Sequence, residues 1–148
     1  MTAHFPAQPF MVLVDDDSHS ARLMIRMLLA HGAPSVSWMQ DEEQANSELT
    51  AMLTDLRSQL PGLVVVDLKS SSDTTREFIA ALRAAPSGDN LLVAAMAPSL
   101  ARETRDELEA AGADAVFERH ADIESYRREA AAIVRFWVRH QRLDAVGT

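Results

Sequence analysis

The sequence predicts an α/β protein built on a parallel sheet of five strands. Short apolar runs recur along the chain, and each is followed by a longer amphipathic segment. Repeated strand-then-helix units imply right-handed crossovers, which place helices on both faces of the sheet. Because ligands of such sheets bind at the carboxyl ends of the strands, candidate functional residues are sought there.

The five apolar runs have the length and β-branched content of buried strands, and they cover residues 10–14, 36–39, 63–67, 91–96 and 115–117. Helical patterns lie between and after them, over about residues 18–31, 42–59, 73–85, 100–111 and 121–142. Ser18 is the expected N-cap of the first helix. Residues typical of helix ends punctuate the pattern at Gly32, Pro61-Gly62, Pro86, Gly88 and Gly112.

The composition excludes several classes of protein. A length of 148 residues with 47% hydrophobic residues suits one globular domain. We place this domain at residues 10–142, between flexible segments at 1–9 and 143–148. The absence of cysteine excludes disulfides and thiolate zinc sites. No apolar run reaches the roughly 18 residues of a membrane span, and no signal-peptide pattern is present, so the protein is expected to be soluble and cytoplasmic.

The charge is unevenly distributed along the chain. The net charge of −8 argues against binding to nucleic acid. From Arg119 onward, however, six arginines and four carboxylates give a net +2, which leaves −10 for residues 1–118. The five histidines are scattered, and the sequence has neither a nucleophile motif nor a glycine-rich phosphate loop. We therefore do not expect an enzyme.

Two predicted strands end in carboxylates. Asp15 and Asp16 follow the first strand, and Asp67 ends the third. If these strands are neighbours, their carboxylates converge at one edge of the sheet and can hold Mg²⁺, which prefers oxygen ligands. The alternative is that Asp15 and Asp17 only favour the start of the next helix through its dipole. The pattern favours the helix-start interpretation for Asp17 and the metal site for the other carboxylates.

These motifs resemble the receiver domain of bacterial two-component response regulators, the CheY-like family. The resemblance rests on the strand followed by Asp15-Asp16 and a helix, on the strand ending in Asp67-Leu68, and on AGAD at residues 111–114. It covers about residues 10–140 and implies a (βα)5 flavodoxin/CheY-like fold with strand order 2-1-3-4-5. It also implies that Asp67 is the phosphoacceptor and that a histidine kinase supplies the phosphoryl group. The implied Mg²⁺ ligands are Asp15, Asp16, Asp67 and the Lys69 backbone carbonyl.

The positions that transmit phosphorylation in this family have changed. Ala97 stands where the family has Thr or Ser, Arg119 where it has Lys, and Val116 where it has an aromatic residue. Ser99 is close to the missing hydroxyl in sequence, but it needs a loop shift to replace it. The turn after the phosphoacceptor reads SSSDTT over residues 70–75, without the usual Pro and Gly. These departures predict a weakened phosphorylation switch with Asp67 retained as an acceptor.

Lys69 is the only lysine of the chain and lies two residues beyond Asp67. Its ammonium could assist a phosphoryl group, or it could neutralise the carboxylates and weaken Mg²⁺ binding. The remaining interpretation is an ordinary solvated loop lysine. The sequence leaves these three alternatives open.

The last predicted helix carries an arginine stripe. At 100° per residue, Trp137 and other apolar residues form the core side, whereas four arginines fall within about 60° on the far side, namely Arg128, Arg135, Arg139 and Arg142. Only Glu124 shares the stripe, so it is a candidate anion-binding surface. A merely solubilising basic face is the alternative. Further contributors to the surface are expected to be Arg119, Tyr126, Arg127 and Phe136.

This stripe resembles that of a divergent set of CheY-like proteins that bind cyclic di-GMP through an arginine-rich last strand and helix. Our first hypothesis is therefore a single-domain signalling protein that docks on a partner such as the flagellar motor, with cyclic di-GMP setting its output. The first alternative is a conventional phosphoreceiver modified on Asp67. The second is an interaction scaffold that needs no ligand.

Overall fold

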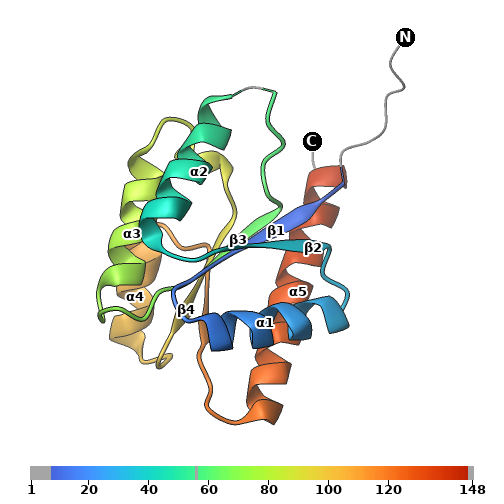
Figure 1. Cartoon of the computed structure of the whole chain (residues 1–148), viewed down its shortest axis with the longest axis vertical. Helices are drawn as coiled ribbons and strands as arrows, with labels where there is room; N and C mark the ends of the chain where they lie inside the picture. Colours follow the sequence, from blue (N-terminus) through green and yellow to red (C-terminus); the bar gives the residue numbers. More distant parts are fainter. Residues whose placement is uncertain (1–7, 56, 147–148) are drawn as a thin grey trace.

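The computed structural model describes residues 8–55 and 57–146, with side chains up to Gln141. One parallel sheet lies at the centre of the chain (Figure 1). Its strands run in the order β2-β1-β3-β4-β5, with the bounds β1 Phe10–Asp15, β2 Ser35–Met39, β3 Leu63–Asp67, β4 Val93–Ala97 and β5 Ala115–Glu118. This confirms the predicted fold class and strand order.

Within the described residues, four α-helices and one short 3-10 helix connect the strands and a fifth α-helix follows β5, with the bounds α1 Ser18–Ala30, α2 Glu42–Thr54, α3 Thr74–Ala84, η1 Gly88–Asn90, α4 Arg102–Ala111 and α5 Ile123–Val146. Helices α1 and α5 cover one face of the sheet, and α2, α3 and α4 cover the other (Figure 1). Each face has its own apolar cluster, because successive side chains of a strand point to opposite sides. In β1, for example, Val12 and Val14 belong to one cluster, and Met11 and Leu13 to the other.

Several boundaries differ from the sequence prediction. The N-cap of α1 is Asp17, whose carboxylate accepts a hydrogen bond from the His19 amide at 3.1 Å, so the Ser18 assignment was wrong. Helix α2 ends at Thr54, well before Pro61-Gly62. Helix α5 continues to Val146, so the segment predicted as a flexible tail begins as helix. Of the predicted N-terminal segment, residues 1–7 lie outside the described residues.

Strand β2 lies at the edge of the sheet, as the predicted strand order implies, but it is not the buried strand that its apolar run was expected to form. Only Met39 of its five residues is buried, and Ser35 and Ser37 are exposed. Alternation of polar and apolar residues is the pattern of a strand with one solvated side. Along the part of the chain that the structure describes, no helix has the length and apolar character needed to cross a membrane.

Candidate functional site

Asp15 and Asp67 lie side by side at the carboxyl edge of the sheet. They are the last residues of β1 and β3 and are paired in the parallel register. Both are buried, with 0% and 1% of their surface exposed. Like charges this close are stable in the protein interior only when cations or hydrogen-bond donors compensate them. The surrounding residues supply both.

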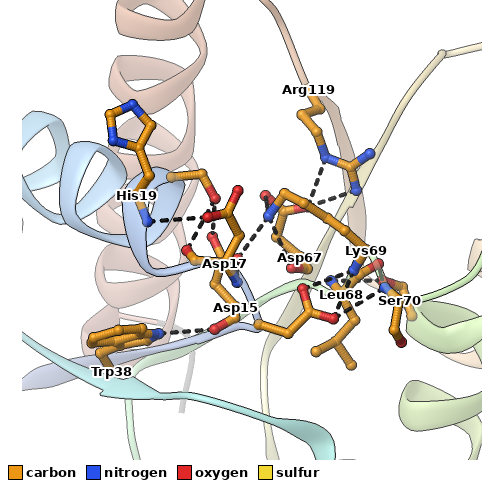
Figure 2. A network of polar contacts seen from close by, with 12 residues as sticks. Asp15, Asp17, His19, Trp38, Asp67, Leu68, Lys69, Ser70 and Arg119 are labelled. Atoms are coloured by element: carbon orange, nitrogen blue, oxygen red, sulfur yellow. Dashed lines mark hydrogen bonds and ion pairs between the residues drawn. The ribbon is translucent and has the colours of Figure 1, made fainter.

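Lys69 bridges the two carboxylates (Figure 2). Its Nζ lies 2.7 Å from Asp15 Oδ1 and 3.0 Å from Asp67 Oδ2. A third contact, of 3.3 Å, joins Nζ to the backbone carbonyl oxygen of Asp67. An ammonium group has three hydrogens to donate and no acceptor, so these three oxygens match its capacity. The structure therefore excludes the solvated loop lysine and supports the neutralising role among the three alternatives.

Arg119 holds the other oxygen of Asp67. The residue follows β5, where its backbone amide donates to the Ala97 carbonyl at 2.7 Å. Its Nε and Nη2 lie 2.8 and 2.6 Å from Asp67 Oδ1. Charge-assisted contacts from a planar guanidinium fix orientation as well as charge. Lys69 and Arg119 thus occupy both carboxylate oxygens of Asp67 (Figure 2).

Asp15 has a fuller set of donors. Besides Lys69, its Oδ1 accepts from the Asp17 amide at 2.9 Å, and its Oδ2 accepts from the Ser20 hydroxyl at 2.8 Å. Burial raises the pKa of Asp15 above its usual value, while the hydrogen bonds from Lys69 and the Asp17 amide act in the opposite direction. Burial is the larger effect. The charged form of Asp15 consequently depends on the Lys69 ammonium.

Asp16 does not join the other two carboxylates. Its oxygens accept hydrogen bonds from the Lys69 amide at 3.0 and 3.1 Å and from the Ser70 amide at 3.0 Å. The side chain therefore fastens the loop after β3. The predicted convergence of three carboxylates was wrong, because Asp16 is directed to these backbone amides. Among the described residues, no group of three or more candidate metal-binding side chains is present.

The residues at this corner do not fit Mg²⁺. This ion requires oxygen ligands at about 2.0–2.1 Å in an octahedron. An oxygen of Asp15 and one of Asp67 already contact the ammonium of Lys69, and both oxygens of Asp16 accept backbone hydrogen bonds. A divalent cation bound to the same oxygens of Asp15 and Asp67 would lie next to the Lys69 ammonium and would be repelled by it. The Lys69 backbone carbonyl was predicted to be a further ligand of this metal site, but the carboxylates that would bind the metal with it are engaged in other contacts.

Two of the three changed switch positions, Ala97 and Val116, are apolar and buried. Ala97 is 1% exposed and Val116 is 8% exposed, and both belong to the cluster beneath α2, α3 and α4. Ser99 is exposed, and its hydroxyl accepts from the Ala101 amide at 2.9 Å, which ties it to its own loop. Ser99 thus does not replace the hydroxyl missing at Ala97. A hollow of about 220 Å³ lies beside Ala97, lined also by Lys69 and Arg119.

The arginine stripe is only partly realised. Arg119 was predicted to join it but is engaged with Asp67, and Tyr126 is buried with its hydroxyl donating to the Ser20 carbonyl at 3.4 Å. Burial raises the pKa of this phenol far above its usual value. Arg127 pairs with Glu124 at 3.0 Å. Tyr126 and Arg119 are therefore removed from the predicted anion surface.

Four arginines are exposed on the part of α5 whose side chains are described; besides Arg127, which pairs with Glu124, they are Arg128, Arg135 and Arg139. Arg128 has only long contacts of 3.5 Å, to the Glu124 carbonyl and the Ser125 hydroxyl. Phe136 is half-buried and packs edge-on against Phe117, with the ring centroids 6.0 Å apart. Trp137 packs against the core as predicted. The side chain of Arg142 lies outside the described residues.

Sequence reasoning missed several supporting residues. Ser20 reaches Asp15 because it lies one turn inside α1, and Trp38 donates from Nε1 to the Asp15 carbonyl at 2.9 Å (Figure 2). Thr75 donates to the Leu68 carbonyl at 3.2 Å and accepts from the Leu68 amide at 3.1 Å. The run of hydroxyl residues at 70–75 was the available signal for this last pair. Its role is to close the loop.

The chain is similar to solved structures of response regulators. No family model and no curated protein sequence matches it. The phosphorylated cyanobacterial phytochrome response regulator RcpA has a TM-score of 0.74 at 20% identity, covering 89% of this chain and 95% of that one. The receiver domain of a response regulator from Rhodospirillum rubrum has a TM-score of 0.73 at 18% identity, covering 87% and 94%. The Mn²⁺-bound response regulator Rcp1 has a TM-score of 0.72 at 18% identity, covering 87% and 94%.

These similarities show that the chain shares the α/β fold of these solved receiver structures. The chemotaxis protein CheY4 of Vibrio cholerae shares the architecture, with a TM-score of 0.63 at 18% identity over 82% of this chain and 95% of that one. The flavodoxin/CheY-like fold expected from the motifs is thus confirmed. Bound Mn²⁺ is a feature of the Rcp1 structure, and phosphorylation is a feature of the RcpA structure.

Proposed function

We propose that the chain is a receiver-type signalling module that acts by docking on a partner protein, and that its acidic corner is held by the chain's own cations. The observation that carries the proposal is the double ion pair of Asp67, with Lys69 Nζ at 3.0 Å on Oδ2 and Arg119 Nη2 at 2.6 Å on Oδ1. The receiver fold supports the signalling role, and signalling targets such as the flagellar motor remain the kind of partner we expect.

Phosphorylation of Asp67 is the alternative function, and the geometry disfavours it. An attacking carboxylate oxygen must first leave Lys69 or Arg119, and the acceptor is only 1% exposed. Nucleophilic attack also needs an accessible electron pair aligned with the donor. After transfer, Ala97 has no hydroxyl to contact the phosphoryl oxygens. A histidine kinase therefore has a poor substrate in the native chain.

Intact-mass measurement with acetyl phosphate tests this choice. We expect no phosphoryl adduct on the native chain, with or without Mg²⁺, and amide NMR spectra that beryllofluoride leaves unchanged. The variant Asp67→Asn is the matched control, since it keeps the shape of the side chain without a nucleophilic carboxylate. An adduct on the native chain that is lost in Asp67→Asn would replace our proposal with the phosphoreceiver function.

Docking is tested separately with a photo-crosslinking residue at Ile123, which is 55% exposed at the start of α5. The expected result is the same crosslinked partner in cells carrying the native chain and the Asp67→Asn variant. A crosslink that requires an intact Asp67 would support phosphorylation control. A chain that forms no specific crosslink from this position or from exposed Leu29 on α1 would contradict docking.

Binding of cyclic di-GMP is a second candidate function, favoured by Arg135 and Arg139. Both are exposed and lie about 6 Å apart along α5, at about 1.5 Å per residue. Neither forms an ion pair among the described side chains. Guanidinium groups suit both the phosphates and the guanine edges of such a ligand. The partner-docking role would then be set by the nucleotide.

Isothermal titration tests the nucleotide hypothesis. We expect micromolar binding that Arg135→Ala and Arg139→Ala each weaken at least about tenfold, a loss of about 1.4 kcal/mol. The control is Arg26→Ala, which removes the same charge from the exposed surface of α1. Absence of binding heat would leave a scaffold that needs no ligand, whereas equal weakening by all three variants would show that general positive charge, and not a site on α5, binds the nucleotide.

A further inference from the structure

The Lys69 ammonium has the contacts of a bound cation rather than those of a surface lysine. It lies within 3.3 Å of three oxygens, one on Asp15 and two on Asp67, and these come from the ends of two different strands. The lysine side chain is 23% exposed, whereas both carboxylates are at most 2% exposed. The Lys69 side chain thus enters from the solvent side and places its positive charge between the two buried carboxylates.

The backbone around Lys69 is fastened on both sides of this residue. Asp16 accepts the Lys69 and Ser70 amides at 3.0–3.1 Å, and Thr75 holds both backbone groups of Leu68. The backbone of three successive residues, Leu68, Lys69 and Ser70, is therefore held by contacts that do not involve the Lys69 side chain. Little backbone entropy is lost when the ammonium is positioned, which favours the ion pairs.

We infer that Lys69 is the resident cation of this corner, so that the native chain takes up no divalent cation between Asp15 and Asp67. The two ion pairs supply the neutralisation that a metal would otherwise provide. Asp16 is released from metal ligation and serves as the clamp of the loop. Lys69 is accordingly a positioning residue for Asp67, and the corner is complete without any added ligand.

The inference concerns the cation of the same corner on which the proposed function rests, but it has its own measurement. Binding of Mn²⁺ alone is followed by the loss of its free-ion signal in electron paramagnetic resonance. We expect no saturable site on the native chain at millimolar Mn²⁺. We expect a site in Lys69→Ala that is at least about tenfold tighter than any residual native binding, because removal of the ammonium leaves Asp15 without an ion pair and frees Oδ2 of Asp67.

Three further variants sharpen this test. Arg76→Ala removes one positive charge from α3, where Arg76 pairs with exposed Asp73 at 3.3 Å. It should leave Mn²⁺ binding at the native level, which separates the bridge from general charge. Lys69→Met keeps the aliphatic stem and should gain the site if Lys69→Ala is unstable. Adding Asp15→Asn to Lys69→Met should remove the acquired site.

A spectroscopic measurement examines the native bridge directly. Lys69 is the only lysine, so a ¹⁵N spectrum of side-chain ammonium groups contains one lysine signal. We expect this signal to be protected from fast hydrogen exchange and to keep its position when Mg²⁺ is added. Its position should move in Asp15→Asn and stay constant in Asp73→Asn, which alters only the exposed pair with Arg76.

The opposite results would overturn the inference. Saturable Mn²⁺ binding by the native chain would show that Lys69 does not fill the corner, as would an ammonium signal displaced by Mg²⁺. Absence of a site in both Lys69 variants, with their folds intact, would show that the ammonium is not what excludes the metal. None of these results depends on docking or on a nucleotide, so failure here is distinguishable from failure of the docking role, which the crosslinking experiment tests by itself.

Discussion

Asp15 and Asp67 are register partners at the ends of neighbouring strands, and one ammonium group contacts both of their carboxylates. The pairing follows from the parallel sheet, but the bridge depends on Lys69. Together with Arg119, this residue balances two buried negative charges with two positive charges. The charges of the ion-paired residues are thus balanced, and the stability of the fold should respond to each of them.

Removal of the Lys69 amine should destabilise the fold. Loss of one partner from a buried ion pair costs about 3–5 kcal/mol, and partial exposure of Lys69 reduces the expected loss for Lys69→Met to about 1–3 kcal/mol. Urea unfolding measures this free energy. The exposed pair is the control, since Arg76→Met should cost less than about 1 kcal/mol. Equal losses in the two variants would contradict a special role for Lys69.

Arg119 should be replaceable by lysine only in part. Arg119→Lys keeps the positive charge but loses the two-point contact of Nε and Nη2 with Asp67. We expect Arg119→Ala to cost about 1–3 kcal/mol in unfolding free energy and Arg119→Lys to recover about half of that loss. Full recovery by lysine would mean that charge alone matters at this position.

The raised pKa of Asp15 gives a pH dependence of definite sign. The folded chain retains a proton on Asp15 in a pH window beginning near the usual value of 3.8 and ending at the raised pKa. Within this window the unfolded chain binds fewer protons, so the contribution of Asp15 to stability falls as the pH rises. The unfolding free energy of the native chain minus that of Asp15→Asn should therefore decrease with pH across this window. A difference that increases there would contradict the raised pKa.

The start of α1 offers a matched pair of neighbouring side chains. Asp17 accepts the His19 amide at 3.1 Å, and Asp17→Ala should cost about 0.5–2 kcal/mol as a lost N-cap. Ser18→Ala should change stability by less than about 0.5 kcal/mol, as expected for a surface substitution. Thermal unfolding of both variants decides between the two residues. A larger loss for Ser18→Ala would restore the assignment made from sequence.

The sequence was informative wherever its periodicity reports the fold. Buried strands β1 and β3 show as β-branched apolar runs, and their terminal carboxylates could be placed at one edge from topology alone. The predicted strand order placed β2 at the edge of the sheet, but its partial exposure was not predicted from its own run, although polar and apolar residues alternate there. The extension of α5 was missed because the composition of residues 143–146 carries no clear periodic signal.

The contacts within the corner were less predictable than its location. Asp16 is adjacent to Asp15 in sequence, and only the path of the loop after β3 decides that it binds backbone amides. The contact of the Arg119 side chain with Asp67 depends likewise on the path of the chain after β5, where the Arg119 amide bonds to the end of β4. Periodicity assigns a side chain to a face of an element, but long flexible side chains at strand ends are placed by tertiary neighbours.

The single lysine allows the acidic corner to be modified selectively by chemical reagents. Because Lys69 carries the only side-chain amine of the chain, an amine-selective reagent has no other side chain to modify. Acylation there would cancel the positive charge that two buried carboxylates share. Modification of this one nitrogen would thus remove the bridge between the carboxylates at the ends of β1 and β3. The contribution of the bridge could then be measured without changing any residue of the sequence.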